Sequence, residues 1–197
     1  EMAALGPELL LSGHGLPIFG QDRIVQALTD TAELLETIED QTLALMNQGL
    51  PLDTCLHEVQ VPAHLADRPY LRPVYDHPQF LVRNVWRRYG GWYDGEPDNL
   101  LPAPRVQQAR EWVALAGGAG PVLDRARALL AGGDARAACH LVEYAALAEP
   151  DNAEVWAVRA DAYRAHSAGQ ESSMARNILG HAARASEQSR RDLAGGR

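Results

Sequence analysis

Lysine is absent from this sequence of 197 residues, and basic residues in general are scarce. All 18 basic residues are arginines, which we interpret as a codon bias of the source genome rather than as eighteen separately selected guanidinium groups. The 26 acidic residues outnumber them, so the formal net charge is -8. Because nucleic-acid-binding domains usually present a basic surface, this composition argues against a nucleic acid as a partner.

Long apolar runs are also missing, since none approaches the roughly 20 residues that a helix needs to span a bilayer, and we expect no membrane span. Only two cysteines occur, Cys55 and Cys139, both in apolar segments that read as helical. We expect buried free thiols rather than a disulfide. The sequence opens at Glu1 without an initiator methionine or a leader, so we expect a fragment of a longer protein and assign no compartment.

Apolar residues spaced three, four and seven apart predict a long amphipathic helix from Asp22, a plausible N-cap, to Gly49, a plausible C′ residue. The opposite face is acidic and should be solvated, with Glu33, Glu36, Glu39 and Asp40. The side chains expected to face the core are Ile24, Leu28, Ala32, Leu35, Ile38 and Leu45.

Residues 51–104 hold most of the prolines and more than half of the aromatic residues, leaving room for short helices at 52–59 and 79–88. From Arg105 onward the sequence is rich in alanine and predicts further helices at 105–116, 120–131, 134–148, 152–167 and 171–190. Two of these hairpins resemble tetratricopeptide units, with small residues at the helix contacts and a Pro-Asp-Asn turn at 150–152. The predicted fold is therefore mainly α, a helical array with tetratricopeptide-like hairpins.

The most distinctive segment is residues 89–97, which packs three aromatic rings and three glycines into nine residues and predicts a shaped loop. Together with residues 81–88 and 99–102 it resembles the signature of the dimerisation region of alkyl sulfatases, which are zinc hydrolases of the metallo-β-lactamase superfamily. The resemblance implies that residues 1–20 are the C-terminal end of a metallo-β-lactamase domain, a short α/β remnant. Residues 21–197 would then be a helical dimerisation domain.

A short apolar run at residues 9–12 predicts a buried strand that ends in the tripeptide Gly13-His14-Gly15. A histidine in such a turn suits a metal, but alone the pattern is weak. The resemblance implies that His14 holds one of two zinc ions. No His-x-His-x-Asp-His run is present, and the other histidines read as surface or packing residues. Since a catalytic zinc needs about three protein ligands, we do not expect this chain alone to turn over substrate.

Three more residues are candidates for contacts with a sulfate ester. Tyr93 could donate a hydrogen bond to the leaving oxygen as a catalytic residue, and Trp92 could cover an alkyl chain. Arg83 could bind the sulfate, with Arg87 one helical turn away. Alternatively, both rings fill a helix or subunit contact, and the arginines pair with some of the many acidic residues.

If the loop has only a structural role, we also expect Asp94 to close a turn through Gly95. The loop aromatics also predict a subunit contact, because large exposed apolar patches are rare on monomers. The residues that would need cover are Trp86, Trp92, Tyr70 and Tyr75.

The function predicted from the sequence is the C-terminal dimerisation portion of a zinc-dependent alkyl sulfatase-like metallo-hydrolase. Its expected partners are a second copy, an N-terminal metallo-β-lactamase portion, and a small sulfate ester bound by the intact parent. The alternative is a non-catalytic tetratricopeptide-like module that binds another protein.

Overall fold

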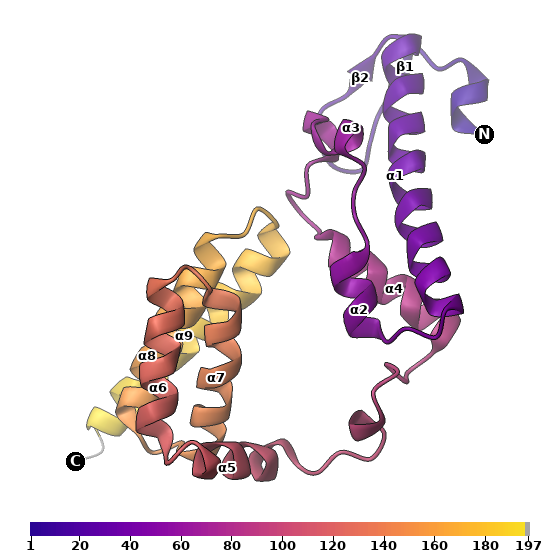
Figure 1. Ribbon diagram of the computed structural model, residues 1–197. Helices are drawn as coiled ribbons and strands as arrows, with labels where there is room; N and C mark the ends of the chain where they lie inside the picture. The colour runs from indigo at the N-terminus through magenta and orange to yellow at the C-terminus, as the bar shows by residue number, and fades with distance from the viewer. Residues whose placement is uncertain (196–197) are drawn as a thin grey trace. The chain divides into compact units, whose positions relative to one another are not determined.

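The computed structural model describes residues 1–195, which are mostly helical with one small sheet, and this confirms the predicted fold class. The chain divides into two compact units (Figure 1). Unit 1 comprises residues 1–73 and 77–99, and unit 2 comprises residues 74–76 and the chain from Leu100 onward. The predicted division into residues 1–20 and 21–197 concerns the families of the two parts and stays a prediction.

Unit 1 begins with a 3-10 turn, η1 (Met2–Leu5), and two short antiparallel strands, β1 (Leu9–Leu10) and β2 (Ile18–Phe19). The second strand was not predicted. The prediction of a buried strand over 9–12 is wrong in length and in burial, because Leu9 is 48% exposed. Successive residues of a strand point to opposite faces, so Leu10 turns partly inward while Leu9 and its neighbour Phe19 face outward.

The long helix predicted next is α1 (Gln21–Asn47). Gly20 and not Asp22 is its N-cap, and Asp22 lies in the first turn, where its carboxylate interacts favourably with the helix dipole. Gly49 follows the C-terminus with φ of +75°, as predicted. Ile24 and Ile38 are buried, but Ala32 is exposed and Leu35 is 48% exposed, so the predicted core stripe is wrong at these two positions.

The rest of unit 1 consists of α2 (Leu52–Glu58), α3 (Ala63–Ala66), η2 (Pro69–Leu71), α4 (Pro78–Gly90) and η3 (Pro97–Asn99). Helices α2 and α4 were predicted, whereas the four-residue α3 was not. The core joins α1, α2 and α4 through Ile38, Cys55, Leu56, Val82 and Trp86. Trp86 is therefore only 9% exposed, and the expectation that a subunit contact covers it is wrong.

Unit 2 contains α5 (Arg105–Leu115), α6 (Ala119–Ala131), α7 (Ala135–Ala148), α8 (Ala153–Ala168) and α9 (Ser173–Gly195), close to the predicted bounds. Polar side chains start two of them: Asp134 accepts a hydrogen bond from the Ala137 amide, and Asn152 accepts one from the Glu154 amide. Small side chains dominate the core and let the helices approach closely. Whether these hairpins are tetratricopeptide units stays a prediction.

A three-residue strap, Val74–Asp76, also belongs to unit 2. The Val74 carbonyl accepts a hydrogen bond from the Ser173 amide at 2.9 Å. The Tyr75 carbonyl accepts hydrogen bonds from the Ser172 hydroxyl at 2.6 Å and from the Met174 amide. The first backbone donors of α9 are thereby satisfied by a segment that lies 97 residues earlier in the chain.

Both cysteines are buried free thiols, as predicted. Within residues 1–195, no helix combines the length and the apolar character needed to cross a membrane.

Candidate functional site

The loop of residues 91–99 is held in shape by Asp94. The Asp94 backbone carbonyl accepts a hydrogen bond from the Leu52 amide at 2.8 Å, which fastens the loop to the start of α2. Its carboxylate accepts hydrogen bonds from the Glu96 amide at 3.0 Å and from the Asn99 side chain at 2.7 Å. These donors, the Glu96 amide first, lower the pKa of Asp94. The turn predicted at Asp94 and Gly95 is present.

Gly95 is required at its position for two reasons. Its φ is +92°, a conformation that residues with a side chain rarely adopt. A Cβ atom at this position would lie 2.9 Å from the Cα of Pro51, which is backbone and cannot rotate away. The glycine therefore lets the loop lie directly against the residue that precedes α2.

Two aromatic residues of α4 anchor the loop and its helix. The Trp86 indole donates a hydrogen bond to the Tyr93 carbonyl at 2.9 Å. The Tyr89 hydroxyl donates a hydrogen bond to the Glu39 carboxylate of α1 at 2.7 Å, and this bond raises the pKa of Tyr89. The Arg88 guanidinium lies 5.4 Å from the centre of the Tyr89 ring. Arg88 thus contacts an aromatic ring of its own helix.

Trp92 and Tyr93 differ in their exposure. The Trp92 side chain is 81% exposed, so no described part of the chain covers it. Tyr93 is partly buried, its ring centre lies 6.0 Å from that of Trp92, and its hydroxyl has no hydrogen-bond partner among the described residues. Trp92 can therefore meet a ligand or a partner surface, and the Tyr93 hydroxyl is free to donate a hydrogen bond.

Two adjoining open grooves lie beside the loop, and Arg83 lines both. The first, of about 440 Å³, is formed by Leu52, Arg83, Trp86, Arg87, Gly91, Trp92 and Asp94. The structure thus brings together Arg83, its helical neighbour Arg87 and Trp92, whereas Tyr93 lines neither groove, and the roles of these residues stay predictions. The second groove, of about 390 Å³, is rimmed by acidic side chains: Asp53, Asp94, Glu96 and Asp98. An anion would therefore be favoured in the first groove and repelled from the second.

His14 lies in the bend between β1 and β2, where the Ser12 hydroxyl donates a hydrogen bond to the His14 carbonyl. Its imidazole is exposed, and the residue lines neither groove. Among the described residues, no group of three or more His, Cys, Asp or Glu side chains could hold a metal ion. The residue fits the role of a single zinc ligand whose companions come from elsewhere, and that role stays a prediction.

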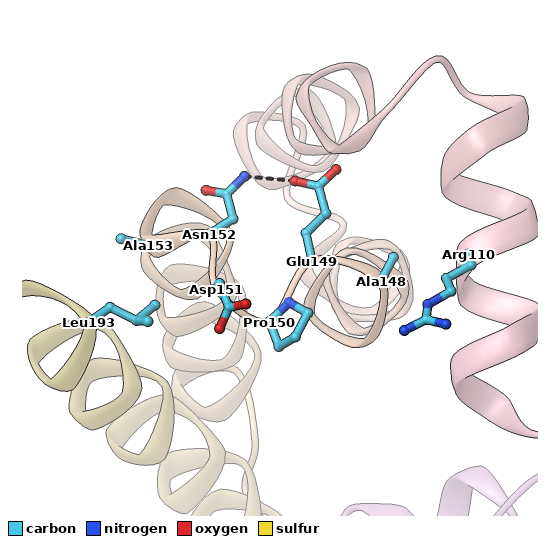
Figure 2. Close-up of a pocket in the computed structure, with 8 residues that line it drawn as sticks. All are labelled: Arg110, Ala148, Glu149, Pro150, Asp151, Asn152, Ala153 and Leu193. Atoms are coloured by element: carbon cyan, nitrogen blue, oxygen red, sulfur yellow. Dashed lines mark hydrogen bonds between the residues drawn. The ribbon is translucent and has the colours of Figure 1, made fainter. Parts of the chain in front are cut away.

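Unit 2 has an open hollow of about 830 Å³ around the turn between α7 and α8 (Figure 2). Arg110 of α5 and Leu193 of α9 also line it. Glu149 is occupied by structural bonds, since it accepts hydrogen bonds from the Asn152 side chain at 2.9 Å and from the Ala119 amide at 3.2 Å. We assign no ligand to this hollow.

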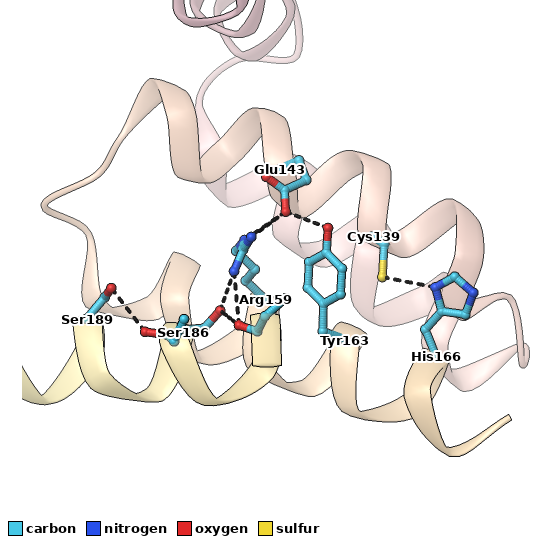
Figure 3. A network of polar contacts seen from close by, with 9 residues as sticks. Cys139, Glu143, Arg159, Tyr163, His166, Ser186 and Ser189 are labelled. Carbon is cyan, nitrogen blue, oxygen red and sulfur yellow. Dashed lines mark hydrogen bonds and ion pairs between the residues drawn. The ribbon is translucent and has the colours of Figure 1, made fainter. Parts of the chain in front are cut away.

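A polar network links α7, α8 and α9 (Figure 3). Glu143 accepts hydrogen bonds from Arg159 at 2.5 Å and from the Tyr163 hydroxyl at 2.5 Å. Arg159 also donates to the Ser186 hydroxyl at 2.5 Å, and its guanidinium lies 4.7 Å from the Tyr163 ring centre. Burial, followed by the Glu143 hydrogen bond, raises the pKa of Tyr163. This network fixes the packing of the three helices.

A second pair in this network joins Cys139 to His166, whose Nδ1 atom lies 3.7 Å from the sulfur. Burial raises the pKa of Cys139 to about 11, so the thiol is a poor nucleophile near neutral pH. Burial also lowers the pKa of His166, with Arg136 and His140 contributing in the same direction. The pair has the character of packed core residues.

The acidic residues of α1 that form hydrogen bonds within unit 1 were not predicted to do so. Glu39 and Glu33 were placed on a solvated face, yet Glu39 accepts the Tyr89 hydrogen bond and Glu33 lies 2.8 Å from His64. Asp30 is buried and accepts a hydrogen bond from Tyr70 at 2.5 Å. Glu39 follows Leu35 of the predicted apolar stripe by one helical turn, and this position could have signalled a partner within the fold.

Comparison with known proteins identifies the family. The model of the alkyl sulfatase dimerisation family matches residues 52–189. The chain is 33% identical, over 83% of its length, to a linear primary-alkylsulfatase of Pseudomonas sp. (strain ATCC 19151). It is 34% identical, over 87% of its length, to an (R)-specific secondary-alkylsulfatase of Pseudomonas sp.. It spans only 31% and 26% of these relatives.

A solved structure agrees with these matches. The stereoselective inverting sec-alkylsulfatase Pisa1 from Pseudomonas sp. superposes with a TM-score of 0.85 at 33% identity, covering 93% of this chain and 28% of that one. The similarity therefore includes the backbone of nearly the whole chain as well as its sequence. The chain belongs to the alkyl sulfatase dimerisation family.

Proposed function

We propose that this chain is the dimerisation portion of a zinc-dependent alkyl sulfatase-like hydrolase and that it joins two copies of the parent enzyme. The observation that carries the proposal is the TM-score of 0.85 to an alkylsulfatase over 93% of the chain. The match of the dimerisation family over residues 52–189 supports the pairing of two copies. Hydrolysis itself belongs to the intact parent, since this chain offers a single candidate zinc ligand.

The N-terminal residues support a second partner, the metallo-β-lactamase portion of the parent. None of residues 1–20 is buried, although many are apolar. The large exposed apolar side chains among them, with exposed fractions from 48% to 87%, are Met2, Leu5, Leu9, Leu11, Leu16 and Phe19. Apolar side chains gathered in one short segment gain free energy by packing on a neighbouring surface. His14 lies within this segment and would reach a shared metal site with it.

In the parent, His14 holds one zinc ion. Zinc, if bound there, would supply a hydroxide near neutral pH and would polarise the sulfate ester. Arg83 and Arg87 offer guanidinium groups to the sulfate oxygens, and exposed Trp92 covers part of the alkyl chain. The Tyr93 hydroxyl, which has no partner in the described residues, donates a hydrogen bond to the leaving oxygen.

A chimera tests the proposal. The matching part of the Pseudomonas linear primary-alkylsulfatase is replaced by this chain, and sulfate release from a linear alkyl sulfate is measured together with bound zinc. We expect His14→Ala to lower the zinc content and to reduce kcat/KM at least about 100-fold. His181→Ala changes an exposed histidine of α9 and serves as the matched control. Unchanged zinc content and activity in the His14→Ala chimera would refute the metal assignment.

A second candidate function is a tetratricopeptide-like module that binds another protein. Helices α6, α7, α8 and α9 pack on one another in chain order, as stacked helical hairpins do. The discriminating measurements are the mass of the chain in light scattering at micromolar concentration and the binding of extended peptides. A monomer that captures a peptide would favour this function over the joining of two copies.

A further inference from the structure

Helix α5 buries few of its side chains for a helix of its length. It has eleven residues, and only Ala109 and Val113 are buried. A helix this short is marginal in water unless tertiary contacts stabilise it. Beside the buried stripe, Trp112 is 60% exposed and Leu115 is 79% exposed. The helix therefore presents a second apolar stripe to solvent.

The second stripe points away from the rest of unit 2. Arg110 reaches the hollow beside the α7–α8 turn (Figure 2), and Trp112 follows two residues later, about 200° further around the helix. Trp112 and Leu115 together expose about 300 Å² of mostly apolar area, which is already as large as the largest patch on many monomers. Such a patch marks a contact surface.

Two residues of opposite charge lie beside this apolar stripe, spaced so that the stripe could pair with the same stripe of another copy. Arg105 and Glu111 are exposed, and neither has a partner among the described residues. Gln108 lies midway between them in sequence. If two α5 helices run antiparallel and cross at Gln108, Arg105 of each lies opposite Glu111 of the other. One twofold contact would thus form two ion pairs while burying both apolar stripes.

We infer that the Trp112 face of α5 packs on the same face of a second copy of this chain, with reciprocal Arg105–Glu111 ion pairs. The inference rests on the proposed joining of two copies and names the surface that does it. In this antiparallel arrangement Trp112 and Leu115 lie over residues 101–104 of the other copy, just ahead of its α5. Leu101 is 91% exposed and Leu100 is 49% exposed, so both are open to such a contact.

The area of this contact suits a dimer. With Leu100 and Leu101 the apolar part rises to about 550 Å² per copy, and an interface core is about 65% apolar. A polar rim that includes Arg105 and Glu111 brings the total close to the roughly 800 Å² per partner of a standard interface. Trp112, about one helical turn from the crossing point at Gln108, has the residue type that dominates binding free energy in such contacts.

The experiment is a charge swap followed by sedimentation equilibrium on the 197-residue chain at low and high salt. Arg105→Glu and Glu111→Arg each place like charges opposite each other, and each should weaken the dimer about 10-fold or more. The double variant Arg105→Glu/Glu111→Arg should regain wild-type affinity. All three variants change only exposed residues, and circular dichroism checks that the helices remain.

Trp112→Ser provides the second measurement and should raise the dimer dissociation constant about 30-fold. Ile178→Ser removes a 62% exposed apolar side chain from α9, outside the proposed face, and should leave the dimer unchanged. A monomeric wild-type chain would overturn both the joining of two copies and this surface. A wild-type dimer that survives Trp112→Ser and both single charge reversals would overturn the surface alone.

Discussion

Replacing Gly95 with alanine should destabilise unit 1 by about 2–5 kcal/mol. Two costs contribute, and they can be worked out separately. A non-glycine residue at a φ of +92° costs about 1–2 kcal/mol. The new Cβ atom would lie 2.9 Å from the Cα of Pro51, and moving a backbone segment to relieve such a contact costs about 1–3 kcal/mol more.

Gly20→Ala is the matched control for the first cost. Gly20 has φ of +93°, nearly the same conformation, but a Cβ atom there would meet nothing within 4 Å. This variant should therefore lose only the conformational part, about 1–2 kcal/mol. The difference between the two variants measures the contact of the loop with the start of α2.

The assay combines urea unfolding with hydrogen exchange at the Leu52 amide. This amide donates to the Asp94 carbonyl at 2.8 Å, so displacement of the loop in Gly95→Ala should speed its exchange. In Gly20→Ala the Leu52 amide should keep its protection apart from any global loss of stability. Equal destabilisation in the two variants, with Leu52 still protected in both, would refute the close approach at Pro51.

Two further predictions concern unit 2. Glu143→Gln leaves the partly buried Arg159 without its counter-charge and should cost about 2–3 kcal/mol in thermal unfolding, whereas Arg127→Gln, which breaks exposed pairs, should cost at most about 1 kcal/mol; equal losses would contradict the role of the network. The pKa of His166 lies below that of the unfolded chain, so its contribution to stability is present above about pH 6.5 and is lost as the pH falls through the lowered value. An NMR titration placing this pKa at or above 6.5 would contradict that sign, and His166→Asn should flatten the pH dependence of urea unfolding.

The helices could largely be predicted from the sequence because their signals are local. Alanine-rich stretches separated by glycine pairs gave α5 to α9 within a few residues, and Asn152 lies where its side chain caps α8. The exposure of Leu35 could not be predicted, because α1 meets its neighbours along a face set by tertiary packing. The strand β2 has only two residues and leaves no clear periodicity.

For the candidate site, the glycines and rings of the loop predicted a shaped turn, and the turn at Asp94 and Gly95 is there. The anchors of this loop could not be predicted, because Glu39 lies 50 residues from Tyr89 and reads as an ordinary solvated acid. The burial of Trp86 within its own unit was also not predicted, because the side chains that surround it come from three helices. Contacts between distant segments depend on the fold and not on local pattern.

The strap of residues 74–76 has a consequence for the way this protein can be made and divided. The opening turn of α9 is completed by carbonyls that lie almost a hundred residues earlier in the chain, so this turn can close only after the two distant segments have met. An expression clone that starts at Leu100 would omit these acceptors and begin its final helix with unsatisfied amides. A clone of the C-terminal helices therefore also has to include residues 74–76, for instance in a circularly permuted chain.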